Sequence, residues 1–555
     1  MFAACLLIII SIILCPLALL VVITALAVNK AINRSYWGYV LLFLAGGIFL
    51  YIGYRLNTPI VPLQIGKFCL SKLLPFLNIP ASYITIRSWI VSDLRTFGAS
   101  TMILMICLYL LSNTPERRMI NAERKVELQK LRPQKIDYLK IAQRSSLIFG
   151  VSGSGKTAFI SKMMERILET KRNSFIVICD GKGSTEKYSL HWAAKILSKR
   201  FKKRLVILNA TSNAHIGGHV YDFLDGVTSV DAAKDMIMTL ITDPTVKQSS
   251  GSEHYRTITE AYLSKFIGFM MENDVDVTLK NIFMLLDPEA LKMALDQIDA
   301  DPSDKDELLT YAQANWPDVK ASFIKLQAFL SGEGRRIFTG DSKRFNIRKA
   351  YESGAIVLIL CSEMDQARLS SALMQLVTMD IRNFVSGRLN GKIDMKRKAY
   401  VFYDEFSSYT SSVPLIKSLY ARARSADVVV SLATQSVSDY ALVDESYFHV
   451  LADNSDSIIS FRQHSVLSSQ SIAELLGTEY HVTNTSRVSN LASTGESSAT
   501  SDKTYIISPD SIRTLPKNKG ILLCKNEKPG HQIKCFKNQF IRQEVHSCKS
   551  RQKKM

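Results

Sequence analysis

Apolar residues occur in long runs near the N-terminus of the chain and in short runs elsewhere. Residues 2–28 contain no charged side chain, residues 37–54 form a second long apolar run, and residues 97–112 form a third. Because about 20 apolar residues cross a bilayer as a helix, the first run predicts a retained membrane-spanning helix, and the first two predict a helical hairpin. The third run is about one turn shorter than a comfortable span. We therefore predict a membrane anchor over residues 1–115 with two or three transmembrane helices.

The short apolar runs beyond residue 140 are typical of buried strands. They cover residues 145–149, 174–179, 204–208, 355–360, 399–403, 426–432, 457–461 and 520–523. Helix-period stretches follow several of these runs, at residues 158–170, 370–385 and 468–476. This alternation predicts an α/β fold with a parallel-rich sheet, whose ligand site lies at the carboxyl ends of the strands.

Between residues 228 and 340 the pattern changes to helix-period apolar residues with few β-branched runs. The clearest helices are expected at residues 232–242, 255–273, 288–298 and 321–330. This stretch predicts an all-helical domain inserted in the α/β fold.

Two polar segments lie near the C-terminus. Residues 483–504 are rich in Ser and Thr and predict a mobile loop. The segment from Lys525 onward is rich in Lys and Arg and ends in a basic tail at residues 547–555, which either contacts nucleic acid or is a solvated end.

The strand at residues 145–149 and the helix at 158–170 flank the run Gly150-Val151-Ser152-Gly153-Ser154-Gly155-Lys156-Thr157. This run fits the phosphate-binding pattern G-x-x-x-x-G-K-[ST] without a mismatch. Such a loop wraps its backbone N–H groups around phosphate oxygens, its lysine supplies positive charge for the β and γ phosphates, and its threonine hydroxyl is a magnesium ligand. The cofactors predicted are ATP and Mg²⁺, bound by Gly150, Gly153, Ser154, Gly155, Lys156 and Thr157.

A nucleotide-binding domain built around this loop is expected to be split by the helical insertion. Its first part is predicted to cover residues 116–227 and its second part residues 341–546, with the inserted domain at 228–340 between them.

Two adjacent carboxylates, Asp404 and Glu405, follow the apolar strand at residues 399–403. This arrangement is typical of a Walker B motif, in which Asp404 holds magnesium and Glu405 polarises the attacking water as general base. The pair is a weak signal alone, but it becomes strong beside an upstream phosphate-binding loop.

Two further polar groups flank the strand at residues 426–432. Gln435 follows it and is predicted to sense the γ-phosphate or orient water, although a glutamine that caps a turn is the alternative. Arg422 and Arg424 precede it, and either could reach the γ-phosphate of a neighbouring subunit as an arginine finger. A solvated basic turn or a DNA contact is the alternative for each arginine.

The formal net charge of +19 is spread over several segments and suits a partner such as DNA or an anionic membrane surface. Excess Lys and Arg on the cytoplasmic side of a membrane protein accounts for part of it. The nine cysteines contain no C-x-x-C pair, so no zinc site or disulfide framework is indicated.

The number of transmembrane helices stays open because two signals conflict. Cytoplasmic ATP places the chain beyond Asn113 inside the cell, and with three spans residues 55–96 would then lie outside. That segment has five basic residues against one acidic residue, which the positive-inside rule disfavours. The hydrophobicity of the third run favours three spans.

Together these features resemble the type IV secretion coupling proteins of the TraD and TraG kind, membrane ATPases related to the FtsK and HerA DNA pumps. The resemblance rests on the N-terminal hairpin, the phosphate-binding loop, the turn at residues 180–183, the helical insertion, the Walker B strand and the stretch around Arg424 and Gln435. It covers most of the chain. One departure is Asp427, where the family often has glycine.

The resemblance implies a RecA-like nucleotide-binding domain and a hexamer in the bacterial inner membrane. Lys156, Thr157, Asp404 and Glu405 would bind and hydrolyse ATP, Gln435 would be the sensor, and Arg424 rather than Arg422 would be the finger in trans. The implied partners are single-stranded DNA with its relaxase and the components of a type IV secretion channel. The alternatives are a double-stranded DNA translocase of the FtsK kind and a receptor for protein substrates alone.

Overall fold

The computed structural model describes residues 129–242, 250–286, 288–405, 412–441, 446–489, 492–527 and 530–541. All of these except Gln129 belong to one compact unit, Lys130–Met555. The predicted transmembrane helices of residues 1–115 and the basic tail at 547–555 lie outside these ranges. Within the described ranges, no helix is both long and apolar enough to cross a membrane.

The centre of this unit is a nine-stranded sheet with the order β13-β12-β9-β1-β8-β7-β2-β6-β3. The seven strands from β9 to β3 in this order pair in parallel, whereas β12 and β13 are antiparallel. This arrangement confirms the predicted α/β class with a mostly parallel sheet. The bounds are β1 (Ser146–Phe149), β2 (Phe175–Asp180), β3 (Leu205–Asn209), β6 (Ile356–Leu360), β7 (Ala399–Asp404), β8 (Val428–Thr434), β9 (Ser457–Ser460), β12 (Lys519–Glu527) and β13 (Gly530–Lys537).

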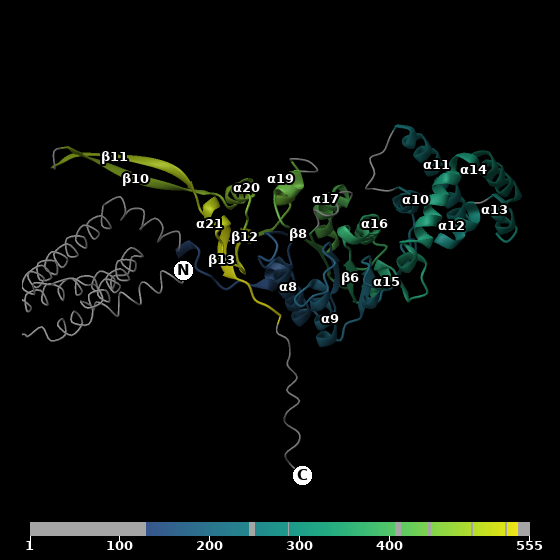
Figure 1. Ribbon diagram of the computed structural model, residues 1–555, viewed down its shortest axis with the longest axis horizontal. Helices are drawn as coiled ribbons and strands as arrows, with labels where there is room; N and C mark the ends of the chain where they lie inside the picture. The colour runs from purple at the N-terminus through teal and green to yellow at the C-terminus, as the bar shows by residue number, and fades with distance from the viewer. Residues whose placement is uncertain are drawn as a thin grey trace, which may run out of the picture. The chain divides into compact units, whose positions relative to one another are not determined.

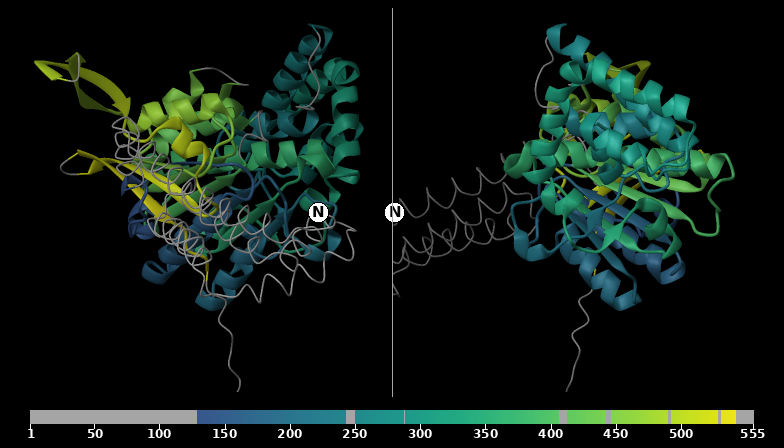
Figure 2. Two further views of the ribbon diagram at one scale, coloured as in Figure 1. Left: turned by 60° about the vertical axis from the view of Figure 1, so that its left-hand side comes forward. Right: turned by 90° about the vertical axis from the view of Figure 1, so that its right-hand side faces the viewer.

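Helices cover both faces of the sheet, which is why its parallel strands are apolar throughout. In β2, Ile176 and Ile178 point into one core, and Val177 and Cys179 into the other. Figure 2 shows the blue helices on one face and the green helices on the other. The first face carries α7 (Tyr138–Ala142), α8 (Lys156–Thr170) and α9 (Leu190–Phe201), and the second carries α15 (Ile347–Glu352), α16 (Glu363–Leu389), α17 (Val413–Arg422), α19 (Tyr447–Asp453), α20 (Val466–Leu476) and α21 (Pro509–Arg513).

Helices also fill the chain between the short parallel pair β4 (Val220–Tyr221) and β5 (Arg344–Phe345). Figure 1 shows them as a teal group. They are α10 (Val230–Ile241), α11 (Ser250–Glu272), α12 (Leu279–Leu286), α13 (Pro288–Leu295) and α14 (Pro302–Ser331), followed by a π-helical turn at Arg335–Thr339. The helix expected at 321–330 is only the end of α14, which begins earlier because Asp301 caps it and a proline occupies its first turn. The division of the chain into domains stays a prediction.

Residues 483–504 are not the loop that their polar composition predicted. The described residues of this segment, 483–489 and 492–504, lie in β10 (Thr478–Ser489) and β11 (Ala492–Tyr505), which pair in antiparallel register from Thr478 with Tyr505 to Ser489 with Ala492. The two strands hydrogen bond to each other along their facing edges, and Thr favours extended backbone. Polarity alone therefore gave the wrong structure.

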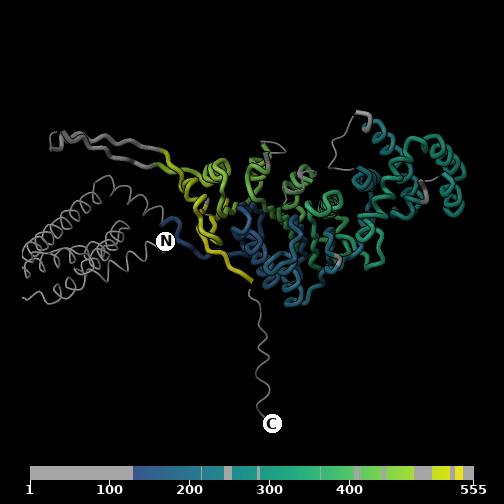
Figure 3. Tube along the Cα trace, viewed as in Figure 1, coloured from purple at the N-terminus to yellow at the C-terminus, as the bar shows by residue number. Residues whose placement is uncertain are grey.

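Part of the Lys- and Arg-rich segment beyond Lys525 belongs to the sheet and is not a solvated end. Strand β12 runs on to Glu527, and β13 pairs beside it. The apolar residues Ile533, Cys535 and Phe536 hold β13 against the core although lysines lie among them. The tube in Figure 3 shows these yellow strands beside the purple-blue segment that precedes α8, where Gln134 N donates to Cys535 O at 2.7 Å.

The remaining short elements within the described ranges are two 3₁₀ turns, η1 (Ala214–Ile216) and η5 (Ala423–Ala426), and the helix α18 (Ser438–Ala441). Turn η5 leads directly into β8, so it lies at the amino end of that strand.

Candidate functional site

The predicted phosphate-binding loop joins the end of β1 to the start of α8. Its first residues hydrogen bond to the end of β8 and to the segment that follows β9. Gly150 N donates to Thr434 O at 3.2 Å, and Val151 N donates to Arg462 O at 3.0 Å. Gly153 and Gly155 have φ angles of +73° and +127°. Residues other than glycine rarely adopt backbone φ angles in this range, so the loop requires glycine at both positions.

Gly150 is required for a different reason, which is close packing. A Cβ atom there would lie 2.5 Å from Ser154 Oγ and 2.7 Å from Phe461 Cβ. The loop therefore packs directly against the residue that follows β9.

Lys156, the first residue of α8, is buried with its amino group inside the loop. Its Nζ donates to Gly150 O and lies 3.8 Å from Glu405 Oε1. A lysine held in this position beside a helix N-terminus and a ring of backbone N–H groups suits a bound phosphate.

Thr157 brings the loop together with the predicted Walker B pair. Its Oγ1 donates to Asp404 Oδ2 at 3.2 Å. Asp404 is the last residue of β7, and burial raises the pKa of its carboxyl to about 6 against the opposing effect of Lys156. Glu405 turns away from the strand with a φ of +57°.

The polar groups of this site fit a magnesium nucleotide. Among the described residues, neither Ser154 Oγ nor Asp404 Oδ1 has a hydrogen-bond partner, although both are buried. Buried oxygens without partners are costly, and a phosphate or a hydrated cation would satisfy them. Hydroxyl and carboxylate oxygens are also the ligands that Mg²⁺ prefers.

Gln435, which follows β8 directly, reaches the same place. Its Nε2 donates to Glu405 Oε2 at 2.9 Å. The structure therefore brings together six of the predicted residues: Gly150, Lys156, Thr157, Asp404, Glu405 and Gln435.

Asp180 is a site residue that sequence reasoning did not single out. It is the last residue of β2 and pairs in register with Asp404 on β7. Its Oδ1 accepts from Lys182 N at 2.9 Å and from Gly183 N at 3.3 Å. Burial and the Asp404 carboxylate raise the pKa of Asp180 to about 7. Its position at the end of a predicted parallel strand was the signal that could have found it.

Arg424 lies apart from these residues. It is in η5, before β8, whereas Gln435 follows that strand. Strand β8 has seven residues, so its amino end, near Arg424, and its carboxyl end, near Gln435, are roughly 20 Å apart. The Arg424 side chain is 79% exposed and its Nη1 lies 3.4 Å from Asp456 Oδ1, while Arg422 is also exposed. At this distance the Arg424 guanidinium does not reach Lys156 of its own chain.

Asp427 ends η5 with a φ of +53°. This is the left-handed region in which glycine is most common and which Asp tolerates better than most residues. The departure from the glycine that the family often has therefore leaves the turn intact.

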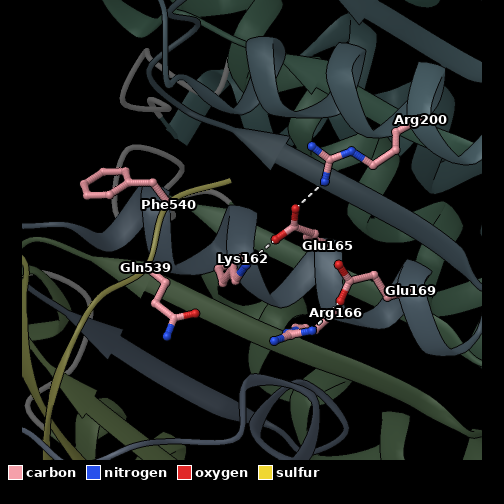
Figure 4. Close-up of a pocket in the computed structure, with 7 residues that line it drawn as sticks. All are labelled: Lys162, Glu165, Arg166, Glu169, Arg200, Gln539 and Phe540. Carbon is pink, nitrogen blue, oxygen red and sulfur yellow. Dashed lines mark hydrogen bonds and ion pairs between the residues drawn. The ribbon is translucent and has the colours of Figure 1, made fainter. Parts of the chain in front are cut away.

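A cavity of about 830 Å³ lies elsewhere, between α8, α9 and the residues Gln539 and Phe540, which follow β13. Figure 4 shows Glu165 between Lys162 and Arg200, with Arg166 paired to Glu169. None of the predicted site residues lines it.

Comparison with known proteins identifies the chain's relatives. A family model for the DNA-binding domain of type IV secretion-system coupling proteins matches residues 138–535. A search of curated proteins found no match.

Several solved structures are similar. The unbound monoclinic form of the bacterial conjugative coupling protein TrwBdeltaN70 is 16% identical, with 73% of this chain and 86% of that chain covered and a TM-score of 0.49. The plasmid coupling protein TrwB in complex with ADP and Mg²⁺ is 16% identical, with coverages of 75% and 92% and a TM-score of 0.47. VirB4 of Thermoanaerobacter pseudethanolicus is 13% identical, with coverages of 72% and 89% and a TM-score of 0.43.

The family match covers well over half of the chain and includes the phosphate-binding loop, both Walker B carboxylates and Gln435. The chain therefore belongs to the family of type IV secretion-system coupling proteins.

Proposed function

We propose that the chain is an ATPase whose hydrolysis drives the delivery of relaxase-bound single-stranded DNA, with or without protein substrates, to a type IV secretion channel. The observation that carries the ATPase part is the 3.2 Å hydrogen bond from Thr157 to Asp404. It joins the phosphate-binding loop to the Walker B strand, which is the arrangement that a magnesium nucleotide requires.

Each residue of the site has a chemical task in this proposal. The loop N–H groups and Lys156 bind the phosphates, while Thr157 and Asp404 hold Mg²⁺, which supplies charge neutralisation on the phosphate oxygens. Glu405 accepts a proton from the attacking water as general base. Gln435 holds the Glu405 carboxylate through its amide, so a change at the γ-phosphate is transmitted to β8.

The arginine finger must come from a second subunit. Arg424 precedes β8, roughly 20 Å along that strand from the site of its own chain, and is largely exposed. In a ring of six subunits, as the family resemblance implies, this exposed guanidinium would face the nucleotide of a neighbour. A hexamer completed in this way is part of the proposal.

The DNA part rests on family membership and on charge. The family model describes a DNA-binding domain, and the chain has a formal net charge of +19. Backbone contacts from Lys and Arg bind nucleic acid with little dependence on sequence. We place the ATPase domain in the cytoplasm and the predicted membrane anchor of residues 1–115 in the bacterial inner membrane.

The DNA part is tested by titrating the full-length protein, held in nanodiscs, with a fluorescent single-stranded oligonucleotide at several salt concentrations. We expect log K to fall linearly with log salt, with a slope of about −0.7 for each phosphate contacted. Binding that is absent or insensitive to salt would contradict DNA delivery and favour a receptor for proteins alone. Stronger binding of a duplex of the same length would favour a translocase of the FtsK kind.

A further inference from the structure

Gln463, three residues beyond the end of β9, lies between the phosphate-binding loop and the end of β8. Its side chain is buried, with an exposed fraction of 1%. In one orientation its amide forms two hydrogen bonds: Oε1 accepts from Gly150 N at 2.9 Å, and Nε2 donates to Gln435 O at 3.2 Å. Of the two amide orientations, this one pairs each donor with an acceptor.

The backbone around Gln463 is fixed on both sides. Phe461 N donates to Phe149 O at 2.8 Å, and Arg462 O accepts from Val151 N at 3.0 Å. Gln463 N itself lies 3.5 Å from Ile512 O, in α21. Because β9 pairs with β1 and the residues after β9 hydrogen bond to the loop, the backbone that carries Gln463 is held beside the loop.

The two groups that Gln463 contacts lead to opposite halves of the site. Gly150 O accepts from Lys156 Nζ, which belongs to the phosphate-binding half. The side chain of Gln435 donates to Glu405, which belongs to the hydrolytic half. One buried amide therefore connects the group that binds phosphate with the group that activates water.

We propose that Gln463 is a positioning residue for ATP hydrolysis, which aligns Gln435 and Glu405 relative to the phosphate-binding loop. The inference rests on the proposed ATPase function and adds to it a residue that does not itself touch the nucleotide. Gly150 N also donates to Thr434 O at 3.2 Å, so the loop keeps a second anchor when Gln463 is changed. The effect of a change is therefore on turnover more than on nucleotide affinity.

The test compares the full-length protein with Gln463→Met, which keeps an unbranched side chain of similar length but cannot form either hydrogen bond. We expect kcat for ATP hydrolysis to fall about tenfold, because a small misplacement of catalytic groups is costly. The dissociation constant for a fluorescent ATP analogue should change less than about threefold. Gln470→Met is the matched control, since Gln470 is exposed on α20, and it should leave kcat within about twofold of wild type.

A double variant separates positioning from a general loss of packing. If Gln463 acts through Gln435, adding Gln463→Met to Gln435→Ala should lower kcat by less than about twofold, because coupled residues are not additive. A full tenfold loss in that background would contradict the proposal, as would an unchanged kcat in Gln463→Met alone.

Gln463→Asn serves if the methionine variant does not fold, because it keeps the amide but withdraws it by one methylene. It should show the same loss of kcat at nearly constant nucleotide affinity, and wild-type turnover would contradict the proposal. Absence of hydrolysis by the unmodified protein would instead contradict the proposed function. Hydrolysis by wild type with no effect of either Gln463 variant would contradict only this inference.

Discussion

Thr157 Oγ1 donates a hydrogen bond to Asp404 Oδ2 at 3.2 Å, across 247 residues of sequence. The helical segment between β4 and β5 lies within this interval, yet the two motifs meet because β1 and β7 both flank β8. Their carboxyl ends therefore lie at the same edge of the sheet.

Glu405→Gln should stop hydrolysis and leave nucleotide binding in place. The change keeps the size of the side chain but removes the base, so we expect kcat to fall at least about 100-fold. The dissociation constant for an ATP analogue should stay within about threefold of wild type. Glu474→Gln, at an exposed position on α20, is the control. Turnover near wild type in Glu405→Gln would show that another group accepts the proton.

Gly150→Ala should damage the loop through its close packing against Ser154 and Phe461. Overpacking of this kind costs about 1–3 kcal/mol, and we expect a lower thermal midpoint together with weaker ATP binding. The control is Gly268→Ala in α11, where a Cβ atom meets nothing within 4 Å. That change should stabilise the protein by about 0.5–1 kcal/mol, because alanine favours helix more than glycine does. Equal effects of the two variants would contradict this account of the loop.

Asp180→Asn should change how stability depends on pH. In the folded protein the pKa of Asp180 is raised to about 7, so the folded state favours the protonated carboxyl. The protonated Asp180 carboxyl therefore contributes stability that is fully present below the unfolded-state pKa of about 4. This stability is lost as pH rises through about 7, because the buried carboxyl must then ionise. Asparagine keeps the acceptor for Lys182 N and Gly183 N but has no charge to bury.

We therefore expect the free energy of unfolding of Asp180→Asn, relative to that of wild type, to rise by about 1–3 kcal/mol from pH 5 to pH 8.5. The measurement is chemical unfolding at both pH values in protein freed of nucleotide and Mg²⁺. The same difference between variant and wild type at the two pH values would show that Asp180 is ionised throughout.

Arg424→Ala should lower ATP turnover without destabilising the subunit. Its side chain is 79% exposed and lies 3.4 Å from Asp456, so its loss removes little from the fold. An arginine finger contributes at least about 1000-fold to hydrolysis in other ATPases and GTPases. Arg422→Ala, two residues earlier and also exposed, is the matched control and should stay within about threefold of wild type. Equal losses in both variants would point to a shared DNA contact instead.

The sequence predicted those parts of the site whose residues are local in the chain. Gly150 to Thr157 lie between a strand and a helix whose apolar patterns are clear, and Asp404 and Glu405 end an apolar strand in the same way. A motif of this kind specifies its own backbone, so it can be recognised without knowledge of its neighbours.

The contacts that depend on strand order could not be predicted in this way. Asp180 lies beside Asp404 because β2 pairs with β7, and Gln463 reaches Gly150 because β9 pairs with β1. Both pairings join segments far apart in the sequence. The hairpin of β10 and β11 was missed because a polar pattern suited to a loop also suits two strands that pair with each other.

ATP hydrolysis by the full-length protein, measured with and without single-stranded DNA and compared with Lys156→Ala, tests the central claim most directly. The buried Lys156 amino group lies between Gly150 O and Glu405, so alanine there removes the charge that faces the phosphates. We predict hydrolysis that single-stranded DNA stimulates in wild type and that is lost in Lys156→Ala. Hydrolysis at the wild-type rate in Lys156→Ala would contradict the account.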